Sequence, residues 1–230
     1  MGALIDQARQ LLQGLVDSDL VEITVLSLAV SGLATAISLL IGVPLGTLMA
    51  LARFRSRGLV LSVVNTGMAL PPVVAGLFIA FMLWRSGPFG DFQLIYTPLA
   101  MVLAEVIIAA PVIVGLTYAA LGQLDPRMRL QLLGLGASRW QTVWWLWREA
   151  RLPLLAALMA GFGSVISEVG AATMVGGNIL HQTRVLTTAI VLDVSRGEFG
   201  QAVALAGVLL TLAFLVNGVL TWAQLRGPHR

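Results

Sequence analysis

Five long apolar stretches dominate the chain, and short polar segments separate them. They run approximately over residues 23–51, 59–84, 95–120, 153–175 and 200–222. A bilayer core of about 30 Å needs roughly 20 consecutive apolar residues in a helix, so each stretch is long enough to cross a membrane. The pattern predicts an all-α integral membrane protein with about five transmembrane helices, organised as a single domain over residues 1–230.

The first twenty residues show a different pattern. Their apolar side chains recur on one helical face, at Leu4, Ile5, Ala8, Leu11, Leu12, Leu15 and Val16. Charged and amide side chains occupy the other positions of this segment. Such a periodicity favours an amphipathic helix that lies on the membrane surface, ahead of a five-span core at 23–222.

Prolines and glycines interrupt the predicted spans. Pro71 and Pro72 stand near the middle of the second span and remove two backbone donors where lipid cannot replace them. The backbone there is expected to be non-helical and to be buried or to line a cavity, although a tolerated kink also fits the sequence. The first span contains Gly42, Pro44 and Gly46, which predict tilt or a kink. Residues 178–199 hold only eight consecutive residues without a charged side chain, so they are predicted to be an interfacial or re-entrant segment on the outer face.

The arginines predict how the chain is oriented. All fourteen basic residues are arginine, and five spans would place ten of them on one side of the membrane and four on the other. The ten follow the first, third and last spans. Because cytoplasmic loops carry the excess of positive charge, residues 123–152 and the C-terminus are expected in the cytoplasm and the N-terminus outside.

The composition excludes several classes of function. Apolar residues make up 58% of the chain and charged residues only 11%, against about 25% charged residues in a typical soluble domain. Without cysteine there is no thiolate chemistry, and without lysine there is no P-loop lysine, so ATP energy would have to come from another subunit. The net charge of +3 arises from arginines beside the spans, where membrane topology accounts for them. The basic charge is therefore no argument for nucleic-acid binding. No catalytic triad or metal-ligand cluster is visible, and the solitary His181 is expected to be solvated.

Residues 123–152 form a charged, tryptophan-rich segment between two spans. The run "GASRWQTVWWLW" after Leu135 suggests a turn that feeds a helix, with Ser138 as its N-cap. Trp140, Trp144 and Trp147 are spaced to share one face of that helix. An interfacial helix with an aromatic belt and a docking element for a cytoplasmic partner are both compatible with this pattern.

The stretch "LGLGASRWQTVWW…EARLPLL" resembles the EAA loop of the permease subunits of binding-protein-dependent ABC importers, and Gly136, Ala137, Ser138 and Arg139 match its most recognisable part. The resemblance implies that a short helix, including Trp140, Trp144 and Trp147, docks on the ATP-binding subunit and transmits its closure to the spans. Two departures are evident. Leu130-Gln131-Leu132 replaces the usual Glu-Ala-Ala, and Pro153 lies about four residues, or roughly one helical turn, farther from Gly136 than usual.

Other stretches extend the resemblance over nearly the whole chain. They are "IGVPLGTLMAL", "NTGMALPPVVAGL", "RSGPFG" and "AMVLAEVIIAAPVIVGLTYAAL". "SEVGAATMVGGNI" and "TRVLTTAIVLDVSRGEF" are similar to the oxyanion branch, and closest to tungstate permeases. The family implies a type I ABC importer permease (MetI-like) fold in the prokaryotic cytoplasmic membrane. It also implies an ATP-binding subunit dimer that holds ATP and Mg²⁺, an extracytoplasmic binding protein and a second permease copy, with no cofactor in this chain.

Two acidic residues, Glu105 and Glu168, fall inside predicted spans. An ionisable group at that depth is costly and suggests a function, yet a carboxylate would repel an anionic substrate. A structural role, in which the carboxyl fixes helix packing, is therefore favoured over substrate contact. The candidate pathway and gate residues are Pro71, Pro72, Asn178, Thr183, Arg184, Thr187 and Thr188. For Arg184 the alternative is a side chain that reaches to the interface.

These observations predict a permease subunit that translocates an oxyanion, with tungstate expected and molybdate or sulfate as alternatives. Two other classes remain open on the residues alone. A secondary transporter would use Glu105 and Glu168 as a proton relay, and a membrane scaffold would use the tryptophan-rich loop only to recruit a protein.

Overall fold

The computed structural model describes residues 18–52 and 54–225, and all regular structure within these ranges is helical. The helices are α2 (Ser18–Leu51), α3 (Arg57–Met68), α4 (Pro72–Leu83), η1 (Gly90–Phe92), α5 (Pro98–Gly122), α6 (Pro126–Gly134), α7 (Arg139–Glu149), α8 (Arg151–Ile166), α9 (Gly170–Gly176), α10 (Leu186–Arg196) and α11 (Phe199–Leu225). The predicted amphipathic helix at 1–20 lies almost entirely outside the described residues.

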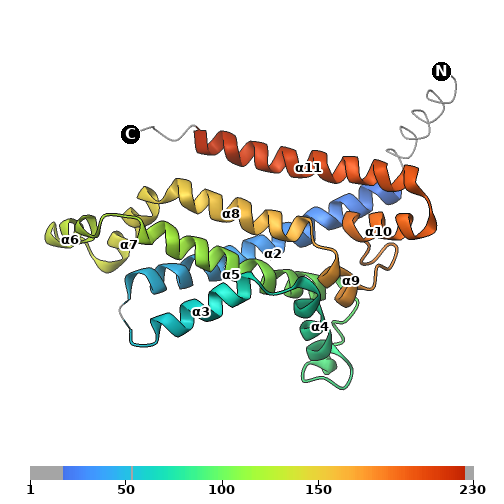
Figure 1. The fold of residues 1–230 in the computed structure, drawn as a ribbon, viewed down its shortest axis with the longest axis horizontal. Helices are drawn as coiled ribbons and strands as arrows, with labels where there is room; N and C mark the ends of the chain where they lie inside the picture. Colours follow the sequence, from blue (N-terminus) through green and yellow to red (C-terminus); the bar gives the residue numbers. More distant parts are fainter. Residues whose placement is uncertain (1–17, 53, 226–230) are drawn as a thin grey trace.

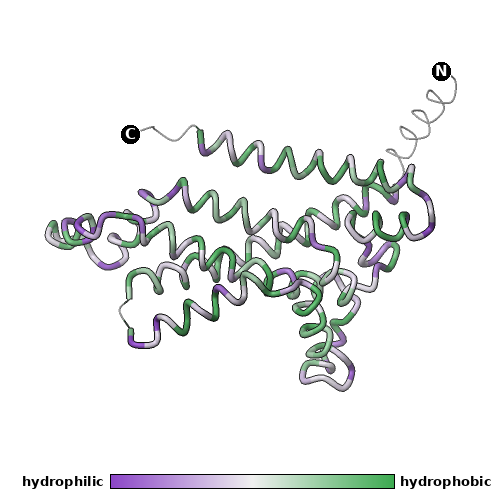
Figure 2. Tube along the Cα trace, in the orientation of Figure 1, coloured by the Kyte–Doolittle hydropathy of each residue, from purple (hydrophilic) through white to green (hydrophobic). Residues whose placement is uncertain are grey.

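Three helices, α2, α5 and α11, are each long and apolar enough to cross a membrane, and the number rises to five if each of two bent helix pairs counts as one span. These helices run roughly along the long axis of the molecule in Figure 1, together with α3 and α8. Figure 2 shows apolar residues along their length and polar residues gathered at the two ends. The most apolar window of α11 has no buried residue, so this helix offers its surface to lipid.

Helix α5 forms the centre of the bundle and packs against α2, α3, α4, α8 and α9. Glycines on α2 let α2 and α5 approach each other closely. A Cβ atom on Gly42 would lie 2.7 Å from Ile113 Cγ2, and one on Gly46 would lie 2.6 Å from the Val114 carbonyl oxygen. Because α2 runs unbroken through Pro44, these glycines act as packing sites between helices.

The predicted second span is broken at its two prolines. Helix α3 ends at Met68, α4 begins at Pro72, and their axes differ by 99°. The expected non-helical backbone is found at Pro71, whereas Pro72 is already the first residue of α4. The turn is too sharp to be a simple proline kink. Helix α4 leaves the bundle at this point and packs on α9, where a Cβ on Gly76 would lie 2.6 Å from Ala171 Cα.

The predicted fourth span at 153–175 is interrupted, which the sequence did not predict. Helix α8 ends at Ile166, and the seven-residue helix α9 starts at Gly170. The reason is a local cap: the Glu168 side chain accepts a hydrogen bond from the Ala171 N–H at 2.9 Å, which satisfies a donor at the start of α9. The chain then forms a loop and α10, whose eleven residues are too few to span a membrane, as the sequence predicted.

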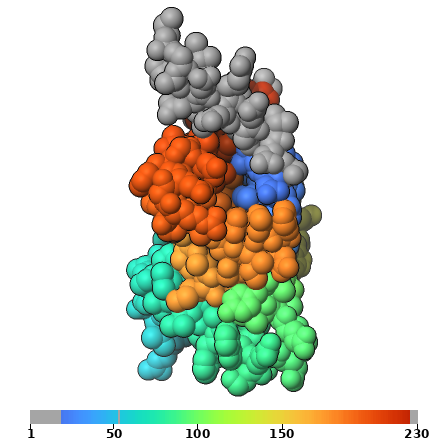
Figure 3. Space-filling view, turned by 90° about the vertical axis from the view of Figure 1, so that its right-hand side faces the viewer, coloured from blue at the N-terminus to red at the C-terminus, as the bar shows by residue number. Residues whose placement is uncertain are grey.

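The bundle has two functionally distinct ends. Figure 1 places α6 and α7 at one end, whereas α9 and α10 lie at the other. The end view of Figure 3 shows the orange chain around α9 between the blue start of α2 and the teal and green chain of α4 and its following loop. The tryptophan-rich segment and the candidate pathway residues are therefore separated by the length of the bundle.

Candidate functional site

The corner between α6 and α7 contains the Gly136-Ala137-Ser138 run. The Gly136 N–H donates to the Leu133 carbonyl and the Ala137 N–H donates to the Leu132 carbonyl, both at 3.0 Å. This bonding pattern is a Schellman motif, in which the residue after the C-cap adopts a left-handed conformation. Gly136 has φ +82°, which explains why this position is glycine.

Helix α7 begins immediately after this motif with a capping box. Ser138 Oγ accepts from the Gln141 N–H at 3.3 Å, and the Gln141 side chain accepts from the Ser138 N–H at 2.8 Å. The predicted N-cap at Ser138 is thus confirmed. Two consecutive capping motifs leave the chain little freedom in how α7 follows α6.

The three tryptophans on the predicted face of α7 do not behave alike. Trp140 is 83% exposed and Trp144 is 62% exposed. Trp147 instead turns toward the bundle and donates from Nε1 to Thr47 Oγ1 of α2 at 2.8 Å. Arg139, the first residue of α7, is exposed. Of the three tryptophans on the predicted face, Trp140 and Trp144 are therefore the exposed ones.

The rest of α7 is anchored to the spans. Leu146 and Ala150 are buried with Leu121 of α5 in a small apolar cluster that Trp147 also contacts. Nearby, Arg129 Nη1 of α6 donates to the Leu51 carbonyl at the end of α2 at 2.9 Å. A displacement of α7 would consequently act on both α2 and α5.

At the other end, the loop between α9 and α10 and the first turn of α10 together carry five of the seven candidate pathway residues. Arg184 Nε donates to Asn178 Oδ1 at 3.1 Å, and Nη2 donates to the Asn178 carbonyl at 3.3 Å. Asn178 Nδ2 donates in turn to the Thr188 carbonyl at 3.2 Å, while Asn178 itself has φ +52°. The structure therefore brings Asn178, Arg184 and Thr188 together as a network that shapes the loop.

The threonine hydroxyls of this region are engaged with the backbone. Thr183 Oγ1 donates to the Gly176 carbonyl at 2.5 Å, Thr187 Oγ1 to the Glu168 carbonyl at 2.7 Å, and Thr188 Oγ1 to the Val185 carbonyl at 3.0 Å. All three residues are buried. In this conformation the hydroxyls fix α9 and α10, and none has a free proton to donate to an oxyanion.

The two helix breaks meet beside Glu168. A Cβ on Gly170 would lie 2.6 Å from Val73 Cγ2 and 3.4 Å from Glu168 Oε1, so the start of α4 after Pro71 and Pro72 lies against the start of α9. The sequence singled out both regions separately but held no signal that they touch. Their contact joins the broken second span to the broken fourth one.

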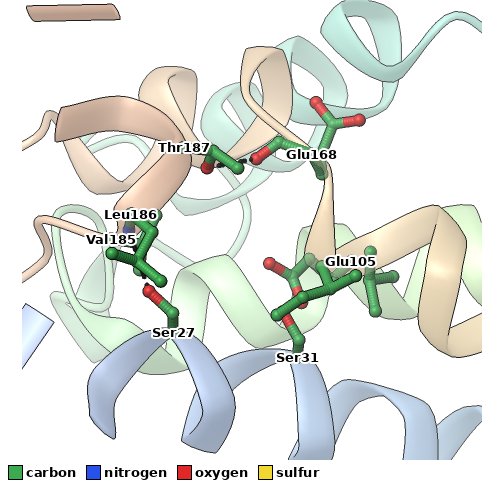
Figure 4. A pocket seen from close by; sticks show the side chains of 9 residues that line it. Ser27, Ser31, Glu105, Glu168, Val185, Leu186 and Thr187 are labelled. Atoms are coloured by element: carbon green, nitrogen blue, oxygen red, sulfur yellow. Dashed lines mark hydrogen bonds between the residues drawn. The ribbon is translucent and has the colours of Figure 1, made fainter. Parts of the chain in front are cut away.

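A small polar cavity lies between α2, α5, the end of α8 and the start of α10 (Figure 4). Its lining residues are Ser27, Ser31, Glu105, Val165, Ile166, Glu168, Val185, Leu186 and Thr187. The cavity has room for about one water molecule, so it is too small for a tetrahedral oxyanion. Ser27 Oγ accepts from the Leu186 N–H at 2.8 Å, a bond between α2 and α10 that the sequence did not reveal.

The sequence suggested that His181 is solitary, but the structure gives it a partner. Its Nδ1 lies 2.8 Å from Glu22 Oε2 at the start of α2, although its side chain is 57% exposed. The hydrogen bond to Glu22 raises the pKa of His181 above its usual value of about 6.5. Among the described residues no group of three or more His, Cys, Asp or Glu side chains is placed to hold a metal ion.

The family of binding-protein-dependent transport system inner membrane components matches residues 42–226 of the chain. A probable anion ABC transporter permease protein of Haloferax volcanii is 38% identical over 92% of this chain and 93% of its own length. The tungstate uptake system permease protein TupB of Peptoclostridium acidaminophilum is 38% identical over 89% of this chain and 90% of its own length.

The fold is also found in solved structures. A chain of the MetNI methionine ABC transporter, in inward-facing conformations, superposes with a TM-score of 0.66 and 19% sequence identity. The match covers 90% of this chain and 93% of that chain. The predicted MetI-like permease fold is thereby confirmed.

Proposed function

Because the chain belongs to the family of binding-protein-dependent transport system inner membrane components, we propose that it is the membrane pathway of an ATP-driven importer for an oxyanion, and that the oxyanion is tungstate. As a permease subunit it has no ATPase activity of its own, and ATP is bound by partner subunits. An extracytoplasmic binding protein delivers the substrate. ATP-driven closure of the partner dimer acts on α7 and alternates access through the spans.

The α6–α7 corner carries this proposal. Two capping motifs hold α7 at one end of the bundle with Trp140 and Trp144 exposed, while Trp147 is bonded to α2. Exposed tryptophans are frequent anchors in protein interfaces. A rigid corner with an exposed aromatic face on one side and a bond to the spans on the other suits a docking element. A membrane scaffold would need the first property but not the second.

The choice of tungstate is supported by sequence likeness, both in two particular stretches and over most of the chain. The stretches 167–179 and 183–199 are similar to tungstate permeases, and TupB of Peptoclostridium acidaminophilum is 38% identical. These stretches build the break between α8 and α9 and the loop with Arg184, at the predicted outer end of the bundle. Molybdate and sulfate are the alternative substrates of the same class.

The proposed arrangement in the membrane follows the arginines. The α6–α7 end faces the cytoplasm, the α9–α10 end faces outward, and the C-terminus is cytoplasmic. A second copy of the chain completes the pathway, because the cavity found within one bundle is too small for an oxyanion. Glu168, which caps α9 and accepts from Thr187, has a structural role in this scheme.

The deciding experiment measures ATP hydrolysis by proteoliposomes that contain this chain with its ATP-binding subunit. Binding protein is added empty or loaded with tungstate, molybdate or sulfate. We expect the largest stimulation with tungstate. Equal stimulation by another oxyanion would keep the importer and remove the tungstate assignment. Substrate uptake that persists without the ATP-binding subunit would favour the proton-coupled secondary transporter.

A further inference from the structure

Glu105 has a buried carboxyl oxygen without a hydrogen-bonding partner. The residue is 3% exposed at the interface of α5 with α2, and its Oε2 atom has no partner among the described residues. The Ser31 hydroxyl is the hydrogen-bonding neighbour of this carboxyl. Figure 4 shows the carboxyl pointing into the polar cavity. A buried acceptor left in this way is costly unless another group occupies the space beside it.

The other groups around this space offer oxygen atoms. Ser27 Oγ donates its proton to the Ile23 carbonyl, and Thr187 Oγ1 donates its proton to the Glu168 carbonyl. A hydroxyl oxygen has two lone pairs, so the Ser27 oxygen keeps one beside its bond from the Leu186 N–H, and the Thr187 oxygen also has lone pairs to offer. The C-terminal residues of α8, Val165 and Ile166, also line the cavity, and a helix C-terminus carries partial negative charge.

The charges around the cavity are also of one sign. Glu168 is the second carboxylate near Glu105, and none of the nine lining residues in the described part of the chain is basic. The Glu168 carboxylate is partly compensated by the Ala171 N–H, whereas Oε2 of Glu105 has no such donor. An ionised Glu105 would therefore have no compensating positive charge in this cavity, which is too small for a side chain or an anion.

We propose that this cavity between α2, α5, α8 and α10 binds one monovalent cation of the size of Na⁺, with the Glu105 carboxyl as the charged ligand and the hydroxyl oxygens of Ser27, Ser31 and Thr187 around it. Hydroxyl and carboxylate oxygens suit a hard cation. A divalent ion is disfavoured because such sites usually supply more carboxylates than the single free one here. Broken-helix ends at mid-membrane sites bind Na⁺ in other transport proteins.

The bound cation would remove an electrostatic conflict. An uncompensated Glu105 beside Glu168 repels any anion that passes the outer half of the bundle, while a cation makes the pair locally less negative. A proton on Glu105 would lower the charge equally, and the pH dependence measured below separates this case from a bound cation. The inference does not depend on which oxyanion is carried, nor on the ATP-binding subunit.

The first test is thermal unfolding of the full chain in lipid nanodiscs, in NaCl and in choline chloride at equal ionic strength. A ligand that binds only the folded state stabilises it, so saturating Na⁺ is expected to raise the midpoint by about 5–10 °C for a chain of this size. Glu105→Gln should abolish this difference, because glutamine is similar in shape but carries no charge. Glu149→Gln, which alters an exposed carboxylate of α7 at the opposite end, is the matched control and should retain it.

The second test is direct binding of ²²Na⁺ to the wild-type chain, which does not depend on the folding of any variant. We expect one ion per chain, displaced by unlabelled NaCl and not by choline. A midpoint that is equal in Na⁺ and choline, or Na⁺ stabilisation that persists in Glu105→Gln, would overturn the proposal. A midpoint that follows pH but not Na⁺ would show that a proton neutralises Glu105 and would overturn it as well.

Discussion

Replacing Gly136 with alanine is expected to weaken binding of the ATP-binding subunit while the spans stay folded. Gly136 has φ +82° and closes the Schellman motif at the end of α6. An L-residue in the left-handed conformation costs about 1–2 kcal/mol relative to glycine. Nothing lies within 4 Å of the position where the new Cβ would stand, so backbone strain is the expected effect and steric collision is not.

The size of the effect follows from this strain. A cost of about 1–2 kcal/mol changes an equilibrium constant by a factor of about 5–30. If the corner relaxes to avoid the strain, α7 no longer presents Trp140 and Trp144 in one orientation. The dissociation constant of the ATP-binding subunit should then rise by up to about 5–30-fold. The hydrophobic spans do not contain the corner and should keep their thermal stability.

The assay is titration of the ATP-binding subunit onto the permease in lipid nanodiscs. Gly134→Ala is the matched control, because Gly134 is the last residue of α6, has open space around it and lacks a positive φ. Gly136→Asn should bind better than Gly136→Ala, since asparagine tolerates the left-handed region. Equal affinities for the Gly136→Ala and Gly134→Ala variants would refute the argument from strain.

Three further predictions concern other contacts. Gly46→Ala should destabilise the chain by about 1–3 kcal/mol through overpacking against the α5 backbone, whereas Gly32→Ala on the same helix has open space and should not; equal unfolding midpoints would contradict this. Trp147→Phe should lower the stability of the chain by about 1 kcal/mol, because the hydrogen bond to Thr47 is lost, and should reduce stimulated ATP hydrolysis. If only the affinity for the ATP-binding subunit falls, transmission through Trp147 is contradicted. His181→Ala should lower the unfolding midpoint at low pH only. A histidine with a raised pKa stabilises the fold at pH values below its usual pKa of about 6.5, and this contribution is lost as the pH rises through the raised pKa. An equal loss at about pH 5.5 and about pH 9 would contradict the Glu22 pairing.

The sequence predicted those features that depend on local chemistry. Long apolar runs located α2, α5 and α11, since the bilayer thickness sets the number of apolar residues that a helix needs. Pro71 and Pro72 located the break between α3 and α4, because a proline cannot donate to the preceding turn. Ser138 located the start of α7 for the complementary reason, as a serine side chain replaces the missing acceptor.

The features that the sequence did not predict depend on contacts between distant parts of the chain. The break after Ile166 contains no proline, and it is stabilised by Glu168, which the sequence placed inside a continuous span. The inward turn of Trp147 depends on Thr47, one hundred positions away. The pairing of His181 with Glu22 spans 159 positions. No periodicity or local propensity reports such partners.

Helix α2 connects these distant contacts. It has 34 residues and is therefore about 51 Å long. Near its end Thr47 accepts from the Trp147 indole, and near its start Ser27 accepts from the Leu186 N–H of α10, each at 2.8 Å. An unbroken helix transmits displacement along its axis better than α3–α4 or α8–α9, which are interrupted. A movement of α7 that keeps the Trp147 bond is therefore expected to act on the helix that also contacts α10, at the opposite end of the bundle.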